Sequence, residues 1–548
     1  MKNLPRSILA LLCLLASWSS SPAAAEETPA KPIKLLTKIG NWHHPVSTTN
    51  AMAQHFFDQG LTLIYGFNHD AAIRSFKRAL ELDPRLALAH WGIGYALGPN
   101  INLDVDPERE KAAFEETQKA LALASHSTPE ENAYIFALTN RYSLNTNADL
   151  KQLQVNFKSA MAEVVKNYPD DLDAATLYAE SMMNLRPWAL WTSDGKPAEG
   201  TEEIVSVLES VLRRDPNHPG ANHYYIHAVE ASPTPERALP SAARLESLVP
   251  IAGHLVHMPA HIYFRTGDYA GAVKRNQIAA AVDRDYIQAC GVKGIYPLLY
   301  YSHNLHFLAI AHTVQGRFGD AMKAADKLLA NVQPAVKEIP LLEGFLPTRA
   351  LILVAFERWP EILKLPAPDP SLKQATAALR FARGLAFAST GNVPEAEAEH
   401  SQLLALKKET PQDAMFSPLN RAQDILNIAD LQLQASIARS KKDFSNAIAL
   451  LQQAAAVEDT LHYDEPPDWY LYSREALGFT FIQSGDPARA EQVFRDDLRR
   501  NPRKGRALYG LQLSLRAQGK KTAEILVKRG FEIAWQNADS PPVASAVK

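Results

Sequence analysis

One set of residue spacings recurs along this chain of 548 residues and limits the folds open to it. Gly60, Ala72, Phe76, Ala79 and Pro84 follow one another at intervals of 12, 4, 3 and 5 residues. Small and aromatic residues at such intervals predict two helices that cross closely, with a proline after the second. The intervals return near the C-terminus, and in part between the two ends, at Gly478, Ala490, Phe494 and Pro502, and at Gly384 and Ala396.

These residues resemble the pattern of the tetratricopeptide repeat family. Gly60 and Gly94 are 34 residues apart, as are Ile226 and Ala260, and 34 residues is the length of that repeat. The resemblance covers residues 53–535 and implies an all-α fold. Helical hairpins would stack into an α-solenoid, a right-handed superhelix with a concave and a convex face. The chain also looks like exported bacterial proteins that are built from this repeat.

Interruptions of the repeat predict how the chain is divided. Residues 99–104 and 186–195 each follow the first helix of a pair, so we expect two loop insertions on the solenoid. The other boundaries come from proline-rich and polar stretches. We expect a signal peptide over 1–25, an extended arm over 26–50, an N-terminal array over 51–358, a Pro-rich junction over 359–371, a C-terminal array over 372–538 and a disordered tail over 539–548.

The N-terminus has the order of a secretory signal. Lys2 and Arg6 precede an apolar run over residues 8–16, and small residues lead up to Ala25. Cleavage after Ala25 would leave 523 residues with a formal net charge of −5. We therefore expect a periplasmic or extracellular protein. Cys290 would be its only cysteine, which excludes an intramolecular disulfide.

Charge and hydropathy exclude several partners. Lys and Arg number 57 against 60 Asp and Glu, so the whole chain offers no electrostatic case for nucleic acid. Beyond the signal peptide no stretch approaches 18 consecutive apolar residues, so no membrane span is expected after its removal.

Histidine is concentrated in three consecutive repeat units. Within each unit the spacings are three, four or seven residues, which places the side chains on one helix face. The histidines also occupy matching offsets from the small-residue position of each unit. We therefore expect one patch across three adjacent first helices, which line the concave groove in the family that the chain resembles. Its members are His223, His227, Glu230, His254, His257, His261, His303 and His306.

Clustered neutral imidazoles beside a carboxylate are a preferred ligand set for transition metals. The sequence thus predicts a metal site, with zinc or copper as the ion, and no motif for a nucleotide cofactor is present. Two alternatives remain open. The histidines could hydrogen-bond the carboxylates of a bound peptide, or could satisfy one another and neighbouring tyrosines in a polar seam.

Other residues at similar offsets predict a ligand-binding groove for a protein, a peptide or a small ligand. These residues are Trp91, Tyr95, Glu180, Asn184 and Arg265. His43 and His44 lie in the predicted arm, where solvated side chains are the usual case, although such an arm can also fold back into a groove.

These features favour an exported binding or scaffold protein over an enzyme. No phosphate loop, HExxH motif or Ser-His-Asp signature is present. A metal-dependent hydrolase stays open, with Glu230 or Glu180 as general base for a metal-activated water. A metal-free peptide-binding scaffold of a cell-envelope complex is the third reading.

Overall fold

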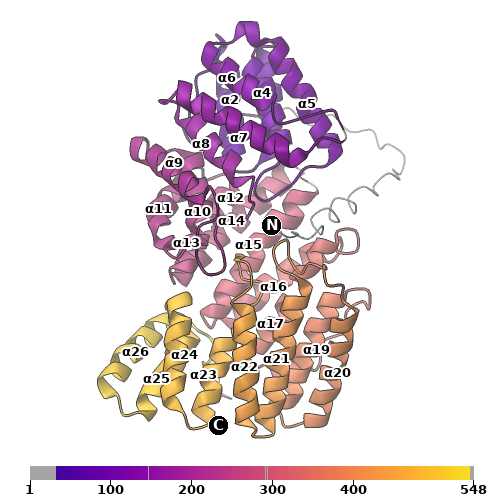
Figure 1. The fold of residues 1–548 in the computed structure, drawn as a ribbon, viewed down its shortest axis with the longest axis vertical. Helices are drawn as coiled ribbons and strands as arrows, with labels where there is room; N and C mark the ends of the chain where they lie inside the picture. Colours follow the sequence, from indigo (N-terminus) through magenta and orange to yellow (C-terminus); the bar gives the residue numbers. More distant parts are fainter. Residues whose placement is uncertain (1–32, 146, 291, 293, 543–548) are drawn as a thin grey trace. The chain divides into compact units, whose positions relative to one another are not determined.

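The fold is all-α and is formed by two compact units, in which antiparallel helical hairpins follow one another (Figure 1). A computed structural model describes residues 33–145, 147–290, 292 and 294–542. The N-terminal unit extends to Met258 and the C-terminal unit starts at Pro259. The predicted signal peptide over 1–25 and the last residues of the predicted tail lie outside the described residues.

The N-terminal unit contains a run of hairpins and short 3-10 turns. Its elements are α2 (Ala51–Tyr65), α3 (His69–Leu82), α4 (Ala87–Leu97), α5 (Pro107–Ala122), η1 (Ala124–His126), α6 (Pro129–Leu138), α7 (Leu150–Asn167), α8 (Leu172–Met183), α9 (Thr201–Arg214), α10 (Pro219–Val229), η2 (Pro235–Ala238), α11 (Leu239–Leu248) and α12 (Gly253–His257).

The C-terminal unit is built in the same way. Its elements are α13 (Pro259–Arg265), α14 (Tyr269–Cys290), α15 (Ile295–Val314), α16 (Phe318–Val332), η3 (Pro340–Phe345), α17 (Thr348–Ala355), α18 (Trp359–Ile362), α19 (Lys373–Ser389), α20 (Val393–Glu409), α21 (Ala422–Ser440), α22 (Phe444–Glu458), α23 (Ser473–Gln483), α24 (Pro487–Arg500), α25 (Gly505–Ala517) and α26 (Lys521–Ala534).

The predicted helix crossings are confirmed at atomic detail. Phe76 on α3 is fully buried, with Gly60 of α2 on one side and Gly92 of α4 on the other. A Cβ atom at either glycine would approach the Phe76 ring to 2.6 Å, so any side chain there would force the helices apart. In the C-terminal unit Phe494 of α24 lies in the same way against Gly478 and Gly510. Each phenylalanine therefore joins one hairpin to the next.

Helix ends also follow the sequence pattern. Pro84, Pro216 and Pro502 each come directly after the residue that caps the second helix of a hairpin. Asn50 accepts hydrogen bonds from two backbone N–H groups at the start of α2, and Thr128 forms a capping box at the start of α6. These local signals fix the hairpin boundaries.

In the N-terminal unit, the first helix of the fifth hairpin (α10) contacts the first helix of the first hairpin (α2). The Nδ1 atom of His223 on α10 lies 2.6 Å from the backbone oxygen of Tyr65 at the end of α2. The Tyr65 hydroxyl donates a hydrogen bond to Asp173 on α8. The inner face of this unit is therefore packed against itself and is not an open channel.

In the C-terminal unit, the first two hairpins contact the segments that flank the last hairpin. The Tyr269 hydroxyl donates to the backbone oxygen of Pro502 at 3.0 Å. Asp539, just after α26, accepts hydrogen bonds from the backbone N–H groups of Phe318 and Gly319 at 2.7 and 2.8 Å. A carboxylate at the start of α16 also complements the dipole of that helix.

Two features differ from the predicted organisation. The His-rich segment 253–265, expected as one helix, forms α12 and α13 because Pro259 has no N–H to continue the first helix. The division between compact units falls at Met258 and Pro259, whereas the sequence places its junction at 359–371. That stretch contains the short helix α18, whose Ile362 is buried in a cluster with residues of α17 and α19.

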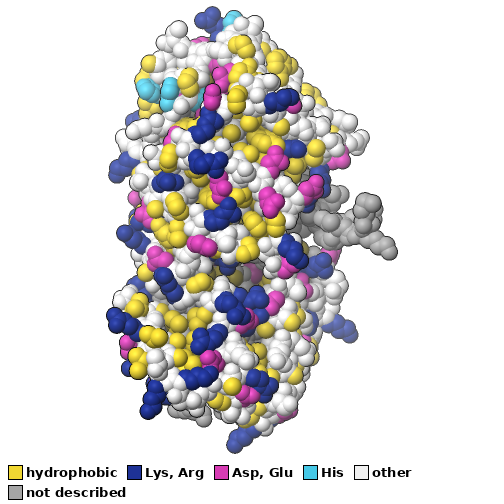
Figure 2. All heavy atoms as spheres, turned by 60° about the vertical axis from the view of Figure 1, so that its left-hand side comes forward, with side chains coloured by type: hydrophobic (Ala, Val, Ile, Leu, Met, Phe, Trp, Pro, Cys, Tyr) yellow, Lys and Arg dark blue, Asp and Glu magenta, His cyan; other side chains and the backbone are white. Residues whose placement is uncertain are grey.

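The surface is mixed in charge. Figure 2 shows Lys and Arg side chains interspersed with Asp and Glu over the face drawn, in agreement with the near-neutral composition. None of the helices in the described part of the chain combines the length and apolar character of a membrane span.

Replacing Phe494 by alanine tests the packing at the crossings. The side chain is 0% exposed, and its removal should lower the free energy of unfolding of the C-terminal unit by about 3–5 kcal/mol. Ile525 on α26 is 67% exposed, so Ile525→Ala serves as control and should change stability by less than about 0.5 kcal/mol. Urea titrations followed by far-UV circular dichroism measure both. Equal shifts in the two variants would show that Phe494 does not hold the hairpins together.

Candidate functional site

Three buried imidazoles of the N-terminal unit lie together. His223 and His227 are one turn apart on α10, and His254 is on α12. One nitrogen from each ring lies within 4.8 Å of one nitrogen from each of the others. The three residues are 0%, 5% and 5% exposed. This grouping is the part of the predicted metal patch that the N-terminal unit brings together.

Hydrogen bonds on the far side of two rings fix which nitrogen can bind a metal. His223 Nδ1 lies 2.6 Å from the Tyr65 carbonyl oxygen, which can only accept, so Nδ1 carries the proton. His227 Nδ1 donates likewise to Glu230 Oε1 at 2.8 Å. Neutral His223 and His227 therefore keep their lone pairs on Nε2. Such carbonyl and carboxylate partners are typical of metal-binding histidines.

The spacing of the rings suits a shared ion. His223 Nε2 and His254 Nε2 are 3.1 Å apart. Two nitrogens on one tetrahedral zinc ion lie about 3.3 Å apart, given bonds of about 2.0 Å. The ring centroid of His223 is 4.9 Å from that of His227 and 4.9 Å from that of His254. Only small side-chain movements would bring the three nitrogens to coordination distance.

Aromatic side chains enclose the three histidines. Phe67 has a φ of 55°, a left-handed conformation that is strained for a residue with a side chain. Its ring centroid lies 4.7 Å from that of His223 and 5.3 Å from that of His254. Trp188, from the insertion over 186–195, places its ring 5.5 Å from that of His227. The insertion over 186–195 thus lies against the three histidines.

The remaining predicted ligands have other surroundings. His257 is fully buried, with its ring centroid 6.0 Å from that of His254. In the C-terminal unit, the ring centroids of His261 and His303 are 5.8 Å apart. His306 packs on Phe345 at 5.3 Å, and burial lowers its pKa to about 4. His306 is therefore a neutral, half-buried side chain.

Four of the five predicted groove residues lie together in the N-terminal unit. The Tyr95 hydroxyl donates to Glu180 Oε2 at 2.5 Å, and Asn184 Nδ2 donates to Glu180 Oε1 at 2.6 Å. Trp91 lies one turn before Tyr95, with ring centroids 5.3 Å apart. Arg265 belongs to the C-terminal unit, where its guanidinium lies 5.4 Å from the ring centroid of Tyr463.

The two carboxyl groups named as possible general bases both have hydrogen-bond partners. Glu230 accepts from His227, an orienting contact. Glu180 is buried, and burial raises its pKa although the Arg141 charge and the hydrogen bonds from Tyr95 and Asn184 act to lower it. Glu230 orients an imidazole and Glu180 holds a buried tyrosine, so these contacts position neither carboxyl group to activate water.

Sequence reasoning missed a carboxylate that organises the same unit. Asp173, in the first turn of α8, accepts hydrogen bonds from the Tyr65 hydroxyl, Trp42 Nε1 at 3.1 Å and His44 Nδ1 at 2.8 Å. His218 Nε2 lies 3.3 Å from Asp173 Oδ1. The motifs NWHHP and DDLD could have indicated the pair, but nothing in their spacing joins them.

The part of the arm described from residue 33 is extended and packs on the inner helices of its own unit. Leu36 N donates to Gln59 Oε1 at 2.7 Å, and Ser47 N donates to Glu131 Oε1 at 2.6 Å. His44 is largely buried, which differs from the solvated state expected for it. The arm therefore covers first-helix side chains that the repeat pattern would leave open.

Charge explains why the arm stays in place. Burial acts to lower the pKa of His44, but the hydrogen bond and charge of Asp173, with Asp171 and Glu130 nearby, raise it to about 9. Burial acts to raise the pKa of Asp173, yet the hydrogen bonds from His218 and His44 hold it well below its usual range. Asp173 is fully engaged, so its proximity to His44 and Asp171 does not by itself define a cation site.

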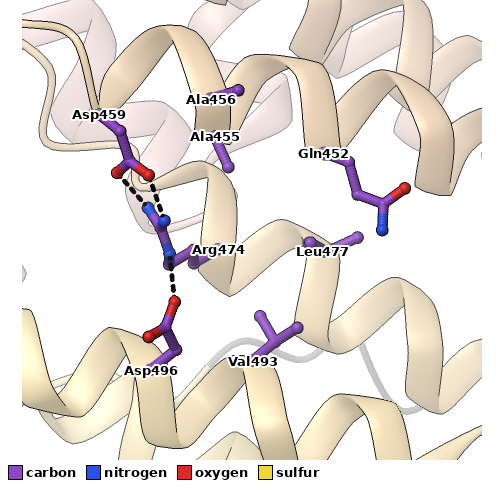
Figure 3. Close-up of a pocket in the computed structure, with 8 residues that line it drawn as sticks. All are labelled: Gln452, Ala455, Ala456, Asp459, Arg474, Leu477, Val493 and Asp496. Carbon is purple, nitrogen blue, oxygen red and sulfur yellow. Dashed lines mark hydrogen bonds and ion pairs between the residues drawn. The ribbon is translucent and has the colours of Figure 1, made fainter.

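A surface pocket in the C-terminal unit is occupied by its own ion pairs. It lies among α22, α23 and α24, and Figure 3 shows the Arg474 guanidinium between Asp459 and Asp496. Arg474 bonds Asp459 at 2.8 and 2.6 Å and Asp496 at 3.1 Å. Arg500 also pairs with Asp459, and Arg499 pairs with Asp496, so all the carboxylates of the pocket already have cationic partners.

The His44–Asp173 pair makes the stability of the N-terminal unit depend on pH. The pKa of His44 is higher in the folded chain, so its contribution is complete below about pH 6.5 and is lost as pH rises towards 9. The loss should be on the order of 3 kcal/mol. Urea unfolding at pH 6.5 and at pH 9 measures this loss in the wild type, in His44→Gln and in the exposed control His43→Gln. Only His44→Gln should remove the pH-dependent part, and an unchanged slope in that variant would contradict the assignment.

Two segments of the sequence match a known repeat, and the match covers both ends of the solenoid. Residues 56–86 and 476–537 match the tetratricopeptide repeat. No curated protein sequence matches the chain.

Solved structures of helical repeat proteins resemble the chain at low identity. A human IFIT1 dimer with m7Gppp-AAAA is 13% identical, covering 89% of this chain and 91% of that one, with a TM-score of 0.34. Yeast Tom70 is 11% identical over 88% and 99% of the two chains, with a TM-score of 0.33. The APC/C hetero-tetramer Cut9-Hcn1 is 12% identical over 90% and 88%, with a TM-score of 0.29. The chain is thus an α-solenoid that carries tetratricopeptide repeats at both ends.

Proposed function

We propose that this chain is an exported binding protein whose N-terminal unit holds one transition-metal ion on His223, His227 and His254. The observation that carries the proposal is the pair of fixed tautomers: Tyr65 and Glu230 each hold an Nδ1 proton and leave Nε2 as the ligand atom. The family of helical repeats supports a scaffold or binding role, because stacked repeats present extended binding surfaces.

The donor set favours a borderline metal. Three imidazoles without a thiolate suit zinc or copper better than magnesium or calcium, which prefer oxygen ligands. Zinc commonly has three protein ligands and a fourth position for water or another ligand. In this unit the fourth position would accept a donor group of the bound partner, such as a carboxylate.

A polar seam without metal would pair these rings through shared protons. His254 Nε2 lies 3.1 Å from His223 Nε2 and could donate to its lone pair. A metal ion would instead be bound by ring nitrogens of all three histidines, with the Nδ1 contacts of His223 and His227 unchanged.

Export and a peptide partner complete the proposal. The signal-like N-terminus supports delivery to the periplasm or the cell exterior, where imidazole is a stable ligand. A protein or peptide partner is the usual ligand class of helical-repeat scaffolds. The arm over residues 33–50 is an extended segment that hydrogen-bonds to inner helices, and this supports a face suited to a peptide backbone.

Metal content after removal of two ligands is the direct test. Protein purified without added metal, or reloaded with zinc, should contain about one ion per chain. His227→Ala with His254→Ala should reduce the content to near zero, while the control His306→Ala should retain it, because His306 packs on Phe345. Elemental analysis measures the ratio and circular dichroism verifies the fold. Equal metal content in both variants, or none in the wild type after reloading, would overturn the site.

Glu230 offers a second test through the orientation of His227. Glu230→Gln keeps the size of the side chain and removes the charge that holds the Nδ1 proton. Loss of such a carboxylate partner should weaken zinc affinity by roughly 10–100-fold without altering helical content. Competition titration with a zinc indicator dye measures the affinity. An unchanged affinity would show that Glu230 does not orient a ligand.

A further inference from the structure

The last helix of the C-terminal unit, α26, exposes a row of apolar side chains. None of the residues of α26 is buried. On its outer side Ile525, Leu526 and Ile533 are 67%, 70% and 60% exposed. They are the most exposed of the large apolar side chains in the described part of the chain. A terminal repeat normally ends its stack with a polar outer face, so this apolar row calls for a partner.

The opposite side of α26 is packed in place, so the helix cannot turn to bury its apolar row. Val527 packs against the buried cluster that includes Leu511 of α25. The Trp535 ring lies so close to Gly505 that a Cβ atom there would approach it to 2.3 Å. Trp535 Nε1 also donates to the Ser540 carbonyl oxygen at 2.8 Å. The exposed row is therefore a fixed feature of the folded unit.

The described chain does not continue the stack beyond α26. In Figure 1, α26 is the outermost helix of the run from α23 to α26. The residues that follow it lead to the start of α16, where Asp539 accepts hydrogen bonds from the backbone N–H groups of Phe318 and Gly319. A cover for the apolar row has to come from outside the described residues.

The spacing of the row fits a second copy of the same helix. Leu526 and Ile533 are seven residues apart, which places them on one helix face and about 10.5 Å apart along the axis. In an antiparallel pair of α26 helices, Leu526 of each copy would face Ile533 of the other. A two-fold axis would therefore form both apolar contacts at once, as in interfaces where the same surface patch of two copies meets.

The charges of α26 complement those of a second copy. Arg529 and Glu532 are exposed, and the ion pair within α26 joins Lys528 to Glu532 at 3.6 Å. In the antiparallel pair, Arg529 would lie about 3 Å along the axis from Glu532 of the second copy, within reach of its long side chain. Symmetry gives this contact twice. Exposed ion pairs add little affinity, but they set the register and orientation of an interface.

A lipid surface fits the same helix less well. Helices that lie in a membrane surface combine an apolar face with a polar face rich in Lys and Arg. One side of α26 is already packed on α25, and only three large apolar side chains remain exposed. Glu532, next to Ile533, would also be repelled by anionic lipids.

We propose that α26 is a self-association surface, through which two copies of the chain form an antiparallel dimer with two-fold symmetry. Leu526 and Ile533 supply the apolar contacts, and Arg529 with Glu532 of the second copy sets the register. A single pair of 14-residue helices buries less than the roughly 1,200 Å² that marks the lower end of stable complexes. We therefore expect a dissociation constant on the order of 10–100 μM. The dimer needs no metal ion.

Sedimentation velocity of the purified, chelator-treated chain tests the apolar contacts. The wild type should shift from monomer to dimer between about 1 and 300 μM. Leu526→Gln with Ile533→Gln should raise the dissociation constant at least about 10-fold, because each dimer loses four apolar side chains from its interface. Leu404→Gln, at a 40% exposed position on α20, is the matched control and should leave the constant unchanged. Circular dichroism verifies the fold of each variant.

Reversing the charges tests the register without removing any apolar side chain. Arg529→Glu sets two negative charges against each other across the dimer, and Glu532→Arg sets two positive charges. Each variant alone should self-associate roughly 3- to 10-fold more weakly than the wild type at low ionic strength. In an equal mixture of the two variants, both charge pairs of a mixed dimer are again of opposite sign. The mixture should therefore associate more tightly than either variant alone.

Several results would overturn the proposal. The wild type could stay monomeric up to about 300 μM. Leu526→Gln with Ile533→Gln could associate as tightly as the wild type or the Leu404→Gln control, or the mixed charge variants could associate no better than either alone. A monomeric wild type that binds vesicles of phosphatidylglycerol through Leu526 and Ile533 would assign this face to lipid instead.

Discussion

The N-terminal unit depends on one buried carboxylate. Asp173 accepts hydrogen bonds from Tyr65 on α2, from Trp42 and His44 in the arm, and lies 3.3 Å from the His218 ring nitrogen at the start of α10. Three chain segments distant in sequence thus meet at one side chain, placed in the first turn of α8, where the helix dipole favours a negative charge. Without this acceptor each donor would be buried and unsatisfied.

The proposed metal site follows from that closure. Tyr65 donates its hydroxyl to Asp173 and offers its backbone oxygen to His223. The same residue therefore fixes the end of α2 and the tautomer of a proposed ligand. Phe67, two residues later, adopts a left-handed conformation that turns its ring against His223 and His254. Backbone strain of this kind persists only where surrounding contacts hold it, and here the closed ring of helices supplies them.

Spacing in the sequence predicted the packing well and the polar interior poorly. Gly60 and Phe76 identify a helix crossing because the hairpin needs a small residue and a ring at fixed intervals. Matching offsets paired His223 with His257, whereas the structure brings His254, one turn earlier, to His223. The Asp173 contacts could not be found in this way, because Trp42 and His44 pair with it across 131 and 129 residues. The repeat spacing predicts contacts within one repeat and between adjacent repeats. The Asp173 contacts join repeats that are far apart in the sequence, so the spacing does not predict them.

The weak repeat pattern in the middle of the chain has a physical origin. Only the faces between helices must keep small and aromatic residues, while inner-face positions are free to vary as long as their polar groups are satisfied. His218, His223 and Asp173 occupy such positions, and each is buried with a named hydrogen-bond partner. The residues of the interior are therefore determined by complementary charges and hydrogen bonds, and not by their spacing in the sequence.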